Sequence, residues 1–224
     1  MEIIAHIYNG FETKFGVPRQ AGIVNDVVSE IVFEKKFRIP EAFRGLEDFS
    51  HIWVLWSFSE AICGEFSPTV RPPRLGGNKR MGVFATRSPF RPNSIGMSAL
   101  KLEKITFDPE RGPVLTVLGA DMKNGTPIYD IKPYLPGFDS IPDAVGGFAD
   151  STRSHSAEVI FPDKLYNKLP SDIARAVKAI LSHDPKPSYR HDDRIYGMEY
   201  SGYEIKFTYT NDKIEVVDIK TAEA

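Results

Sequence analysis

Short apolar runs separated by turn residues fill the first 135 positions of this chain, and they constrain its fold more than any other feature. The run HIWVLWSF at 51–58 predicts a core strand, and residues 94–105 alternate in a strand-like, though imperfect, way. Further strands are expected from the apolar runs at 2–8, 31–33 and 113–119. Residues 40–46 favour a single helical turn. We therefore expect strands to dominate this part of the chain.

The last third of the sequence has a different pattern. Gly, Pro, Asp and Ser are abundant at 136–153, which predicts a long loop and a domain boundary. Apolar residues at helical spacing then predict a helix over 171–182, and two strands are expected at 203–209 and 214–219, joined by a polar turn. The expected organisation is mainly β, with a larger domain at 1–150 and a smaller α+β domain at 151–224.

Composition narrows the functional classes. With 224 residues, 42% hydrophobic and 26% charged, the chain reads as a soluble globular protein. It lacks a signal peptide pattern and any run long enough for a membrane span, so we expect a cytoplasmic protein without membrane contact. The lone Cys63 excludes an intrachain disulfide, and the histidines lack ligand spacing, so no metal is expected. Hydrolase, NTPase and Rossmann motifs are absent from the sequence.

The segment at 82–97, GVFATRSPFRPNSIGM, combines a rigid backbone with fixed charge. Pro89 and Pro92 restrict their own φ and disfavour helical geometry in the residues before them, so the segment should be a shaped loop. Arg87 and Arg91 flank the first proline, and guanidinium groups suit a carboxylate, a phosphate or a base edge. The loop therefore predicts a site for an anion or a cofactor.

The wider segment 71–102 has seven basic residues and no Asp or Glu, although the net charge of the chain is −2. These residues are Arg71, Arg74, Lys79, Arg80, Arg87, Arg91 and Lys101. Clustered cations neutralise phosphates, so the segment predicts RNA or DNA as a partner. Phe84 and Phe90 lie among the arginines, and Phe90 is the better candidate for stacking on an unpaired base. The alternatives are a solvated loop whose charges are paired elsewhere, and core packing of Phe90.

A second candidate is KNGTPIYDIKPYL at 123–135, where the turn Asn124-Gly125-Thr126-Pro127 precedes an extended segment. On a strand, Asp130, Lys132 and Tyr134 would point to one side, which gathers an acid, a base and a phenol in one row. The alternative is a surface strand with an internal ion pair.

Three blocks of this sequence resemble the signature blocks of the TsaA-like family. They are FRGLEDFSHIWVLWSF at 43–58, GVFATRSPFRPNSIGMSALKL at 82–102 and NGTPIYDIKPYLP at 124–136. The characterised bacterial members are TrmO-type tRNA (adenine-N6)-methyltransferases. The resemblance covers most of residues 1–150, and the C-terminal unit resembles the extension of bacterial members.

This resemblance implies an S-adenosylmethionine-dependent enzyme on a small β-barrel, working as a homodimer with the cofactor near the subunit interface. The implied substrate is the threonylcarbamoyl-modified adenosine beside the anticodon of threonine tRNAs that read ACN codons. The chain departs from the family pattern at Ser59 and Glu60, where many relatives have a histidine. It also departs at Ser94, where a proline is usual, and at Asn124, where an aspartate is usual.

The resemblance also implies roles for individual residues. The implied cofactor contacts are Pro18, Arg19, Gln20, Ser59, Glu60, Arg87, Met97, Asn124, Gly125, Thr126 and Pro127. The candidate RNA contacts are Arg80, Phe90, Arg91 and Asn93. The adenine nitrogen must lose a proton around the time it attacks, so Asp130 or Tyr134 is the candidate acceptor. Lys132 would activate Tyr134 or pair with the threonyl carboxylate.

Two other functions remain open from the sequence. One is a non-catalytic RNA-binding module that keeps the barrel and the arginines. The other is a methyltransferase of the same fold acting on another nucleotide or on a small molecule. A measurement of cofactor binding distinguishes the first alternative from the tRNA methyltransferase. A comparison of modified with unmodified tRNA as substrates distinguishes the second.

Overall fold

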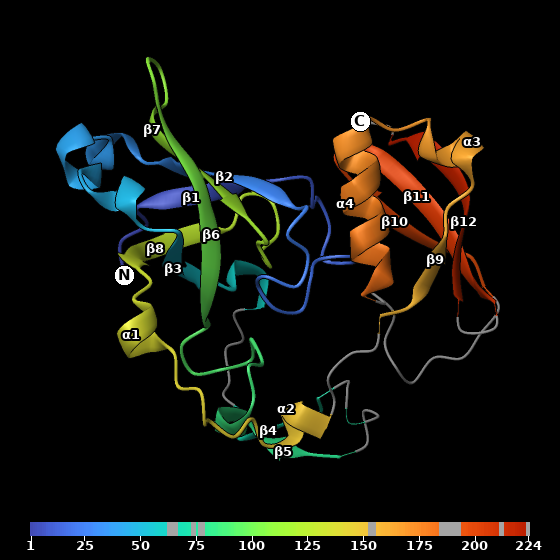
Figure 1. Cartoon of the computed structure of the whole chain (residues 1–224). Helices are drawn as coiled ribbons and strands as arrows, with labels where there is room; N and C mark the ends of the chain where they lie inside the picture. The colour runs from blue at the N-terminus through green and yellow to red at the C-terminus, as the bar shows by residue number, and fades with distance from the viewer. Residues whose placement is uncertain are drawn as a thin grey trace.

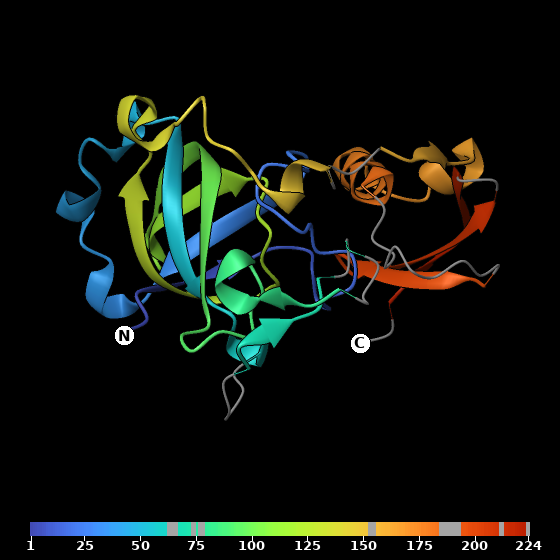
Figure 2. The ribbon, with the colours of Figure 1, turned by 90° about the horizontal axis from the view of Figure 1, so that it is seen from below.

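The structure is a computed structural model, and it describes residues 1–61, 67–72, 75, 79–151, 156–183, 194–210 and 213–222. Figure 1 shows two lobes side by side, a β-barrel and a smaller sheet covered by a helix. The view from below in Figure 2 shows the same two lobes along one long axis. Cys63, Arg74, His155, His191 and the expected turn at 211–212 lie outside the described residues.

Six strands build the barrel. They are β1 (Ala5–Tyr8), β2 (Val28–Phe33), β3 (His51–Ser57), β6 (Ile95–Asp108), β7 (Gly112–Leu118) and β8 (Pro127–Pro133). They close in the order β1-β2-β7-β6-β3-β8, and every neighbouring pair is antiparallel. The expected mainly β fold with a small N-terminal barrel is confirmed.

Alternation along β3 explains why these residues form a barrel wall. Ile52, Val54 and Trp56 are buried in the barrel interior, whereas Trp53 and Leu55 alternate with them on the outer side. The neighbouring strands contribute buried apolar residues to the same cluster. Burial of apolar surface along every strand therefore stabilises the closed sheet.

Short elements connect the barrel strands. Turns of 3-10 helix lie at Lys35–Phe37, Pro40–Phe43, Leu46–Asp48, Ser59–Ala61 and Val83–Ala85, and short strands β4 (Thr69–Val70) and β5 (Met81–Gly82) pair with each other. The single helical turn expected at 40–46 is thus two short turns, because Gly45 adopts a left-handed φ of 85° between them. After the barrel come α1 (Pro136–Asp139) and α2 (Phe148–Ser151).

The C-terminal lobe is a four-stranded sheet in the order β10-β11-β12-β9. Its elements are β9 (Glu158–Ile160), α3 (Asp163–Tyr166), α4 (Ser171–Ser182), β10 (Tyr196–Tyr200), β11 (Tyr203–Thr210) and β12 (Lys213–Thr221). The helix expected at 171–182 and the paired strands β11 and β12 are confirmed. α4 buries an apolar stripe that includes Val177, Ile180 and Leu181.

Part of the N-terminal sequence belongs to the core of this C-terminal lobe. Phe11, Val24 and Val27 are buried in the same apolar cluster as α4 and the sheet, and Phe15 packs against that cluster. In Figure 1 this dark blue segment leaves the barrel and reaches α4. The two lobes therefore share a core segment, although the sequence between them at 136–153 has the composition of a linker.

Candidate functional site at one rim of the barrel

One end of the barrel gathers most of the residues that the sequence proposes for the cofactor. Here β1, β3 and β7 end, while β2, β6 and β8 begin. We call this end the rim, and it is formed by residues 9–22, 58–61, 83–94 and 119–127. All of the implied cofactor residues except Met97 lie in these segments, so the antiparallel topology brings together residues that are far apart in the sequence.

Arg87 and Gln20 are in direct contact at the rim. The guanidinium group of Arg87 donates a hydrogen bond from Nη1 to Oε1 of Gln20, and the Gln20 amide nitrogen donates to the carbonyl oxygen of Arg19 at 2.5 Å. Arg87 and Arg19 are exposed, whereas Pro18 is buried. The pair therefore presents guanidinium and amide groups on a loop whose proline anchors it.

Beneath this pair lies a hydrogen-bonded row that sequence reasoning missed. The indole nitrogen of Trp56 donates to Ser98 Oγ at 3.0 Å, and the Ser98 hydroxyl donates to Asp121 Oδ1 at 2.6 Å. Burial raises the pKa of Asp121 above its ordinary value, while hydrogen bonds from Ser98 and from the backbone of Ala21, together with the charge of Arg87, oppose the increase. The available signal was an acidic residue two positions after the apolar run at 113–119.

The turn at 123–127 has a defined backbone. Gly125 has a φ of +75°, a conformation that favours glycine, and its N–H donates to the carbonyl oxygen of Ile7 at 2.8 Å. The Thr126 hydroxyl donates to the carbonyl oxygen of Lys123 at 2.7 Å. The turn is therefore fixed to β1 and internally braced, with Pro127 opening β8.

Asn124 uses both ends of its side-chain amide. Its Oδ1 accepts the backbone N–H of Asn9 at 3.1 Å, and its Nδ2 donates to Glu12 Oε1 at 2.9 Å. The Asn124 amide thus meets a carboxylate, which an ionised aspartate at this position could not hydrogen-bond.

Glu60 is the centre of a small ion-pair network. Its carboxylate lies 2.5 Å from Lys123 Nζ and 3.2 Å from Lys14 Nζ. The hydrogen bond from Lys123, followed by that from Lys14, lowers the pKa of Glu60 below its usual value. Ser59 beside it is exposed. Glu60 is therefore a carboxylate with two cationic neighbours.

The arginines of the shaped loop have different surroundings. The Nη1 group of Arg91 donates to the carbonyl oxygens of Thr86, at 2.7 Å, and Val83, at 3.3 Å. Its guanidinium group also lies 5.9 Å from the centre of the Phe84 ring. Arg80 donates to Thr69 Oγ1 at 3.0 Å. Arg91 therefore braces the turn at 83–86 in addition to any external contact.

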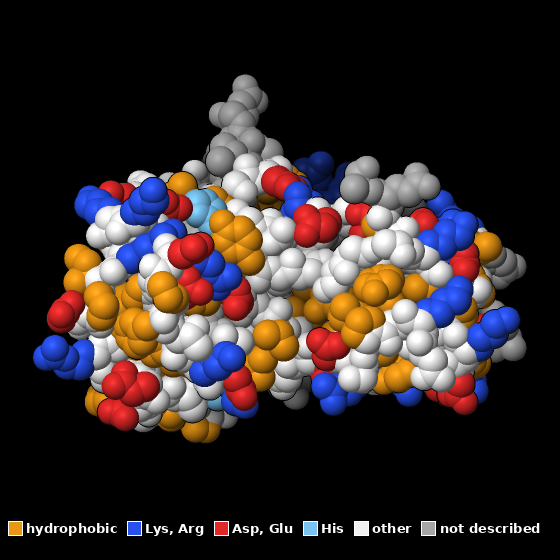
Figure 3. Space-filling model, turned by 90° about the horizontal axis from the view of Figure 1, so that it is seen from above, with side chains coloured by type: hydrophobic (Ala, Val, Ile, Leu, Met, Phe, Trp, Pro, Cys, Tyr) orange, Lys and Arg blue, Asp and Glu red, His pale blue; other side chains and the backbone are white. Residues whose placement is uncertain are grey.

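The same loop exposes two phenylalanines. Phe84 is 74% exposed and Phe90 is 50% exposed, so core packing of Phe90 is excluded. Asn93 is also exposed. Within the described residues, Arg80, Arg87 and Arg91 form no ion pair. Figure 3, which views one face of the molecule, shows acidic and basic side chains interspersed over both lobes rather than separated by sign.

The row on β8 lies on the outer wall of the barrel. Asp130 Oδ2 is 3.3 Å from Lys132 Nζ, and the Tyr134 ring lies 5.4 Å from that of Trp53, so the expected common face is confirmed. Met97 is 59% exposed on the same wall, opposite Leu55 in the β3–β6 pairing.

Distance separates part of this row from the rim. Tyr134 pairs with His51 at the far end of β3, and its N–H donates to the carbonyl oxygen of His51 at 3.0 Å. Tyr134 lies seven positions beyond Pro127 along the extended chain, which corresponds to about 23 Å. Within this chain Tyr134 does not lie at the rim, whereas Asp130 is only three positions beyond Pro127.

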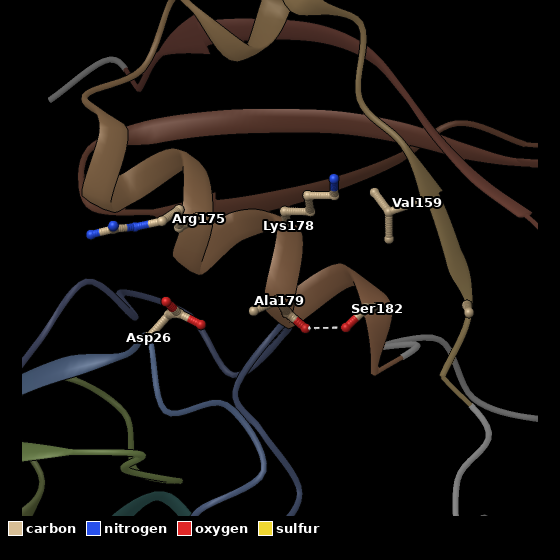
Figure 4. Close-up of a pocket in the computed structure, with 7 residues that line it drawn as sticks. Asp26, Val159, Arg175, Lys178, Ala179 and Ser182 are labelled. Atoms are coloured by element: carbon tan, nitrogen blue, oxygen red, sulfur yellow. Dashed lines mark hydrogen bonds between the residues drawn. The ribbon is translucent and has the colours of Figure 1, made fainter.

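A shallow pocket lies elsewhere, at the junction of the two lobes. It is lined by Asp26, from the loop before β2, and by α4 residues that include Arg175, Lys178 and Ala179. Figure 4 shows Asp26 near Arg175 and Ala179, with the Lys178 side chain pointing away from it. The pocket contains none of the residues proposed from the sequence. Across the described ranges, no group of three His, Cys, Asp or Glu side chains is arranged to hold a metal ion. In the same ranges, no helix has the length and apolar character needed to cross a membrane.

Comparisons with known proteins place both lobes in one class, the tRNA methyltransferases. The family model for the tRNA-methyltransferase O N-terminal domain matches residues 6–140, and that for the TrmO C-terminal domain matches residues 155–222. The chain therefore belongs to the TrmO family.

Individual relatives agree with this membership. A tRNA (adenine(37)-N6)-methyltransferase from Escherichia coli K12 is 38% identical over 225 residues, covering 96% of this chain and 95% of the relative. One from Eikenella corrodens is 45% identical over 161 residues, covering 71% and 90%. The crystal structure of TrmO from Pseudomonas aeruginosa superposes with a TM-score of 0.79 at 30% identity, covering 98% of this chain and 96% of that one.

Proposed function

We propose that this protein is an S-adenosylmethionine-dependent tRNA methyltransferase that modifies N6 of adenosine 37, as its relatives are named to do. The finer substrate we propose is the threonylcarbamoyl-modified adenosine in threonine tRNAs that read ACN codons. The observation that carries this proposal is the full-length family match, together with a rim that gathers the implied cofactor residues. A tRNA substrate is consistent with a cytoplasmic location.

The chemistry of the rim fits the cofactor. S-adenosylmethionine carries a carboxylate, an ammonium group and a positively charged sulfonium whose methyl group it supplies. Arg87 and Gln20 offer guanidinium and amide donors for a carboxylate, and Asp121 and Glu60 provide negative charge nearby. The residues that would hold the cofactor are Pro18, Arg19, Gln20, Ser59, Glu60, Arg87, Asn124, Gly125, Thr126 and Pro127.

Asp130 is the proton acceptor that we propose within one subunit. The N6 group must lose a proton as it attacks, and Asp130 is a solvent-accessible carboxylate near the rim. Lys132, held beside it, would contact the threonyl carboxylate once that group approaches. Positioning of the nucleophile and the methyl group in line supplies much of the rate in a displacement of this kind.

A homodimer would explain the residues on the outer wall. Met97 and Tyr134 lie on the wall formed by β6, β3 and β8 rather than on the rim, and Trp53 and Leu55 are only partly buried there. We propose that a second subunit covers this wall, so that Met97 and Tyr134 of one subunit approach the rim of the other. The cofactor would then lie close to the subunit interface.

The shaped loop would bind the RNA. Single-stranded RNA is recognised by stacking of unpaired bases on aromatic rings and by cations on the backbone. Phe90 is exposed for stacking, and Arg80, Arg91 and Asn93 lie on the same basic segment. Because the arginines have no ion-pair partner among the described residues, their charge is available to phosphates.

The test is methyl transfer from labelled S-adenosylmethionine to purified tRNA, followed by mass spectrometry of the nucleosides. We expect methylated threonylcarbamoyladenosine with modified threonine tRNA, and no product with unmodified transcript. Asp130→Ala should abolish the product, whereas Arg44→Ala, at an exposed arginine outside the rim, should not.

Other outcomes would identify the alternatives. If tRNA binds but neither methyl transfer nor S-adenosylhomocysteine binding occurs, the protein is an RNA-binding module. If unmodified tRNA or another substrate is methylated instead, the reaction class stands and the finer substrate is wrong.

A further inference from the structure

The loop that carries Pro18, Arg19 and Gln20 rests on the C-terminal sheet. Phe15 packs against two adjacent aromatic residues of that sheet, with its ring centre 6.4 Å from Tyr196 and 6.3 Å from Phe207, and interplanar angles of 13° and 8°. The rings of Tyr196 and Phe207 are themselves 5.8 Å apart, so the three rings form one cluster. Phe11 meets Tyr200 edge-on at 5.0 Å. The apolar residues of this loop therefore have their partners in the other lobe.

Two glycines allow this close approach. Gly16 has a φ of +98°, and a β-carbon there would overlap the side chain of Met198 on β10. Gly10 lies equally close to Ser201, whose backbone N–H donates to the Gly10 carbonyl oxygen at 2.8 Å. Only residues without a side chain fit at these two points, so the backbone of the loop lies directly against the sheet.

The same loop, which is itself part of the rim, also contacts the three other rim segments. Glu12 accepts the hydrogen bond from Asn124 at 2.9 Å, and Lys14 pairs with Glu60 at 3.2 Å. Gln20 accepts from Arg87. Three separate rim segments, the turn at 123–127, the turn at 59–61 and the shaped loop, thus each take a contact from one loop.

We infer that the C-terminal domain positions the cofactor rim, and that Phe15 is the positioning residue through which it acts. Residues 9–24 contain no helix or strand of their own, so holding them in one conformation costs about 1–2 kcal/mol of backbone entropy per residue. Packing on the C-terminal sheet meets that cost before the cofactor arrives, and preorganisation of this kind increases affinity without a new contact. This inference rests on the proposed cofactor function of the rim.

The test compares two Phe→Ala variants in the full-length protein. Phe15→Ala removes the contact with the sheet beneath the loop. Phe161→Ala is the matched control, because Phe161 also packs at the edge of the same C-terminal core and meets Tyr166 edge-on at 5.1 Å, between β9 and α3. Binding of S-adenosylhomocysteine is measured by calorimetry, and steady-state rates are measured with modified tRNA.

We expect Phe15→Ala to weaken S-adenosylhomocysteine binding about tenfold, and to raise the KM for S-adenosylmethionine with little change in kcat. Phe161→Ala should leave both within about twofold at a comparable loss of thermal stability. Phe15→Leu, which keeps most of the apolar volume, should restore binding. If Phe15→Ala does not fold, Phe15→Val replaces it, with an expected weakening of about threefold.

Three results would contradict the inference or its basis. Equal binding by the wild type and Phe15→Ala would overturn the positioning role while leaving the proposed function intact. Equal weakening in Phe15→Ala and Phe161→Ala would reduce the role of Phe15 to general stability. A folded wild-type protein that binds no S-adenosylhomocysteine would overturn the proposed function itself.

Discussion

Gly96 on β6 lies directly across from Trp56 on β3, and a β-carbon at Gly96 would overlap the Trp56 indole ring. The ring needs this space because its nitrogen donates to Ser98, which in turn holds Asp121. Gly96→Ala should therefore destabilise the protein by about 1–3 kcal/mol, through displacement of a buried ring. Urea unfolding followed by tryptophan fluorescence measures the change.

Gly137→Ala is the matched control for that prediction, because no atom lies within 4 Å of the position that its β-carbon would take. Its free energy of unfolding should differ from that of the wild type by less than about 0.5 kcal/mol. Equal stability of Gly96→Ala and Gly137→Ala would show that the indole moves aside without cost.

The hydrogen bond from Asn124 to Glu12 predicts the effect of an aspartate at position 124. In Asn124→Asp the second carboxylate oxygen would face Glu12 where Nδ2 now donates, so one hydrogen bond is replaced by repulsion. We expect a loss of about 1 kcal/mol in unfolding free energy. Glu12→Gln in the same chain should recover most of it, because the glutamine amide can donate. If the single variant is as stable as the wild type, the Glu12 contact contributes nothing.

Asp121 predicts a pH dependence with a definite sign. Burial raises its folded-state pKa above the unfolded value, so between these two values the folded protein binds more protons than the unfolded chain. The contribution of Asp121 to stability is thus greatest below the ordinary carboxyl pKa and is lost as pH rises through the raised value. Asp121→Asn, which cannot titrate, should lack this decrease.

Unfolding free energies of the wild type and Asp121→Asn, measured at intervals between about pH 4 and pH 7, test that sign. The difference, wild type minus variant, should fall as pH rises and then level off. A difference that rises with pH would mean that hydrogen bonds from Ser98 and Ala21 outweigh burial.

Alanine variants of Arg87 and Arg91 should differ in which ligand they bind more weakly. Arg87→Ala should weaken S-adenosylhomocysteine binding about tenfold, because Arg87 is hydrogen-bonded to Gln20 at the rim and offers a charged donor. Arg91→Ala should mainly weaken tRNA binding. It should also cost about 1 kcal/mol of stability, since the carbonyl oxygens of Val83 and Thr86 lose their donor. The reverse pattern in calorimetry and filter binding would exchange the two assignments.

The elements that were predictable from the sequence are those with a strong local pattern. The runs at 51–58 and 113–119 became β3 and β7, and the apolar stripe at 171–182 became α4. β9 was missed because its three residues depend on parallel pairing with β12, which no local pattern reveals. β10 has a local strand pattern that was overlooked, since buried Tyr196, Met198 and Tyr200 alternate with exposed Gly197 and Glu199.

The sequence singled out many residues of the candidate site, but it did not predict which of them contact one another. The arginines, the Asn-Gly-Thr-Pro turn and the row on β8 stood out as residue types. That Arg87 meets Gln20, 67 positions away, depends on closure of the barrel, and the buried position of Asp121 depends on Ser98 and Trp56 of other strands. Tyr134 lies at the end of the barrel away from the rim, and this placement likewise follows from the length of the strand rather than from spacing in the sequence.

The shared core segment has a consequence for synthesis on the ribosome. Residues 9–24 are translated well before their partners, because the partners of Phe11 and Phe15 are on β10 and β11, at 196–200 and 203–210. A nascent chain can pair its barrel strands while this loop still exposes its aromatic side chains. A prematurely terminated chain would therefore display an apolar loop that chaperones and proteases recognise, and only the completed polypeptide conceals it.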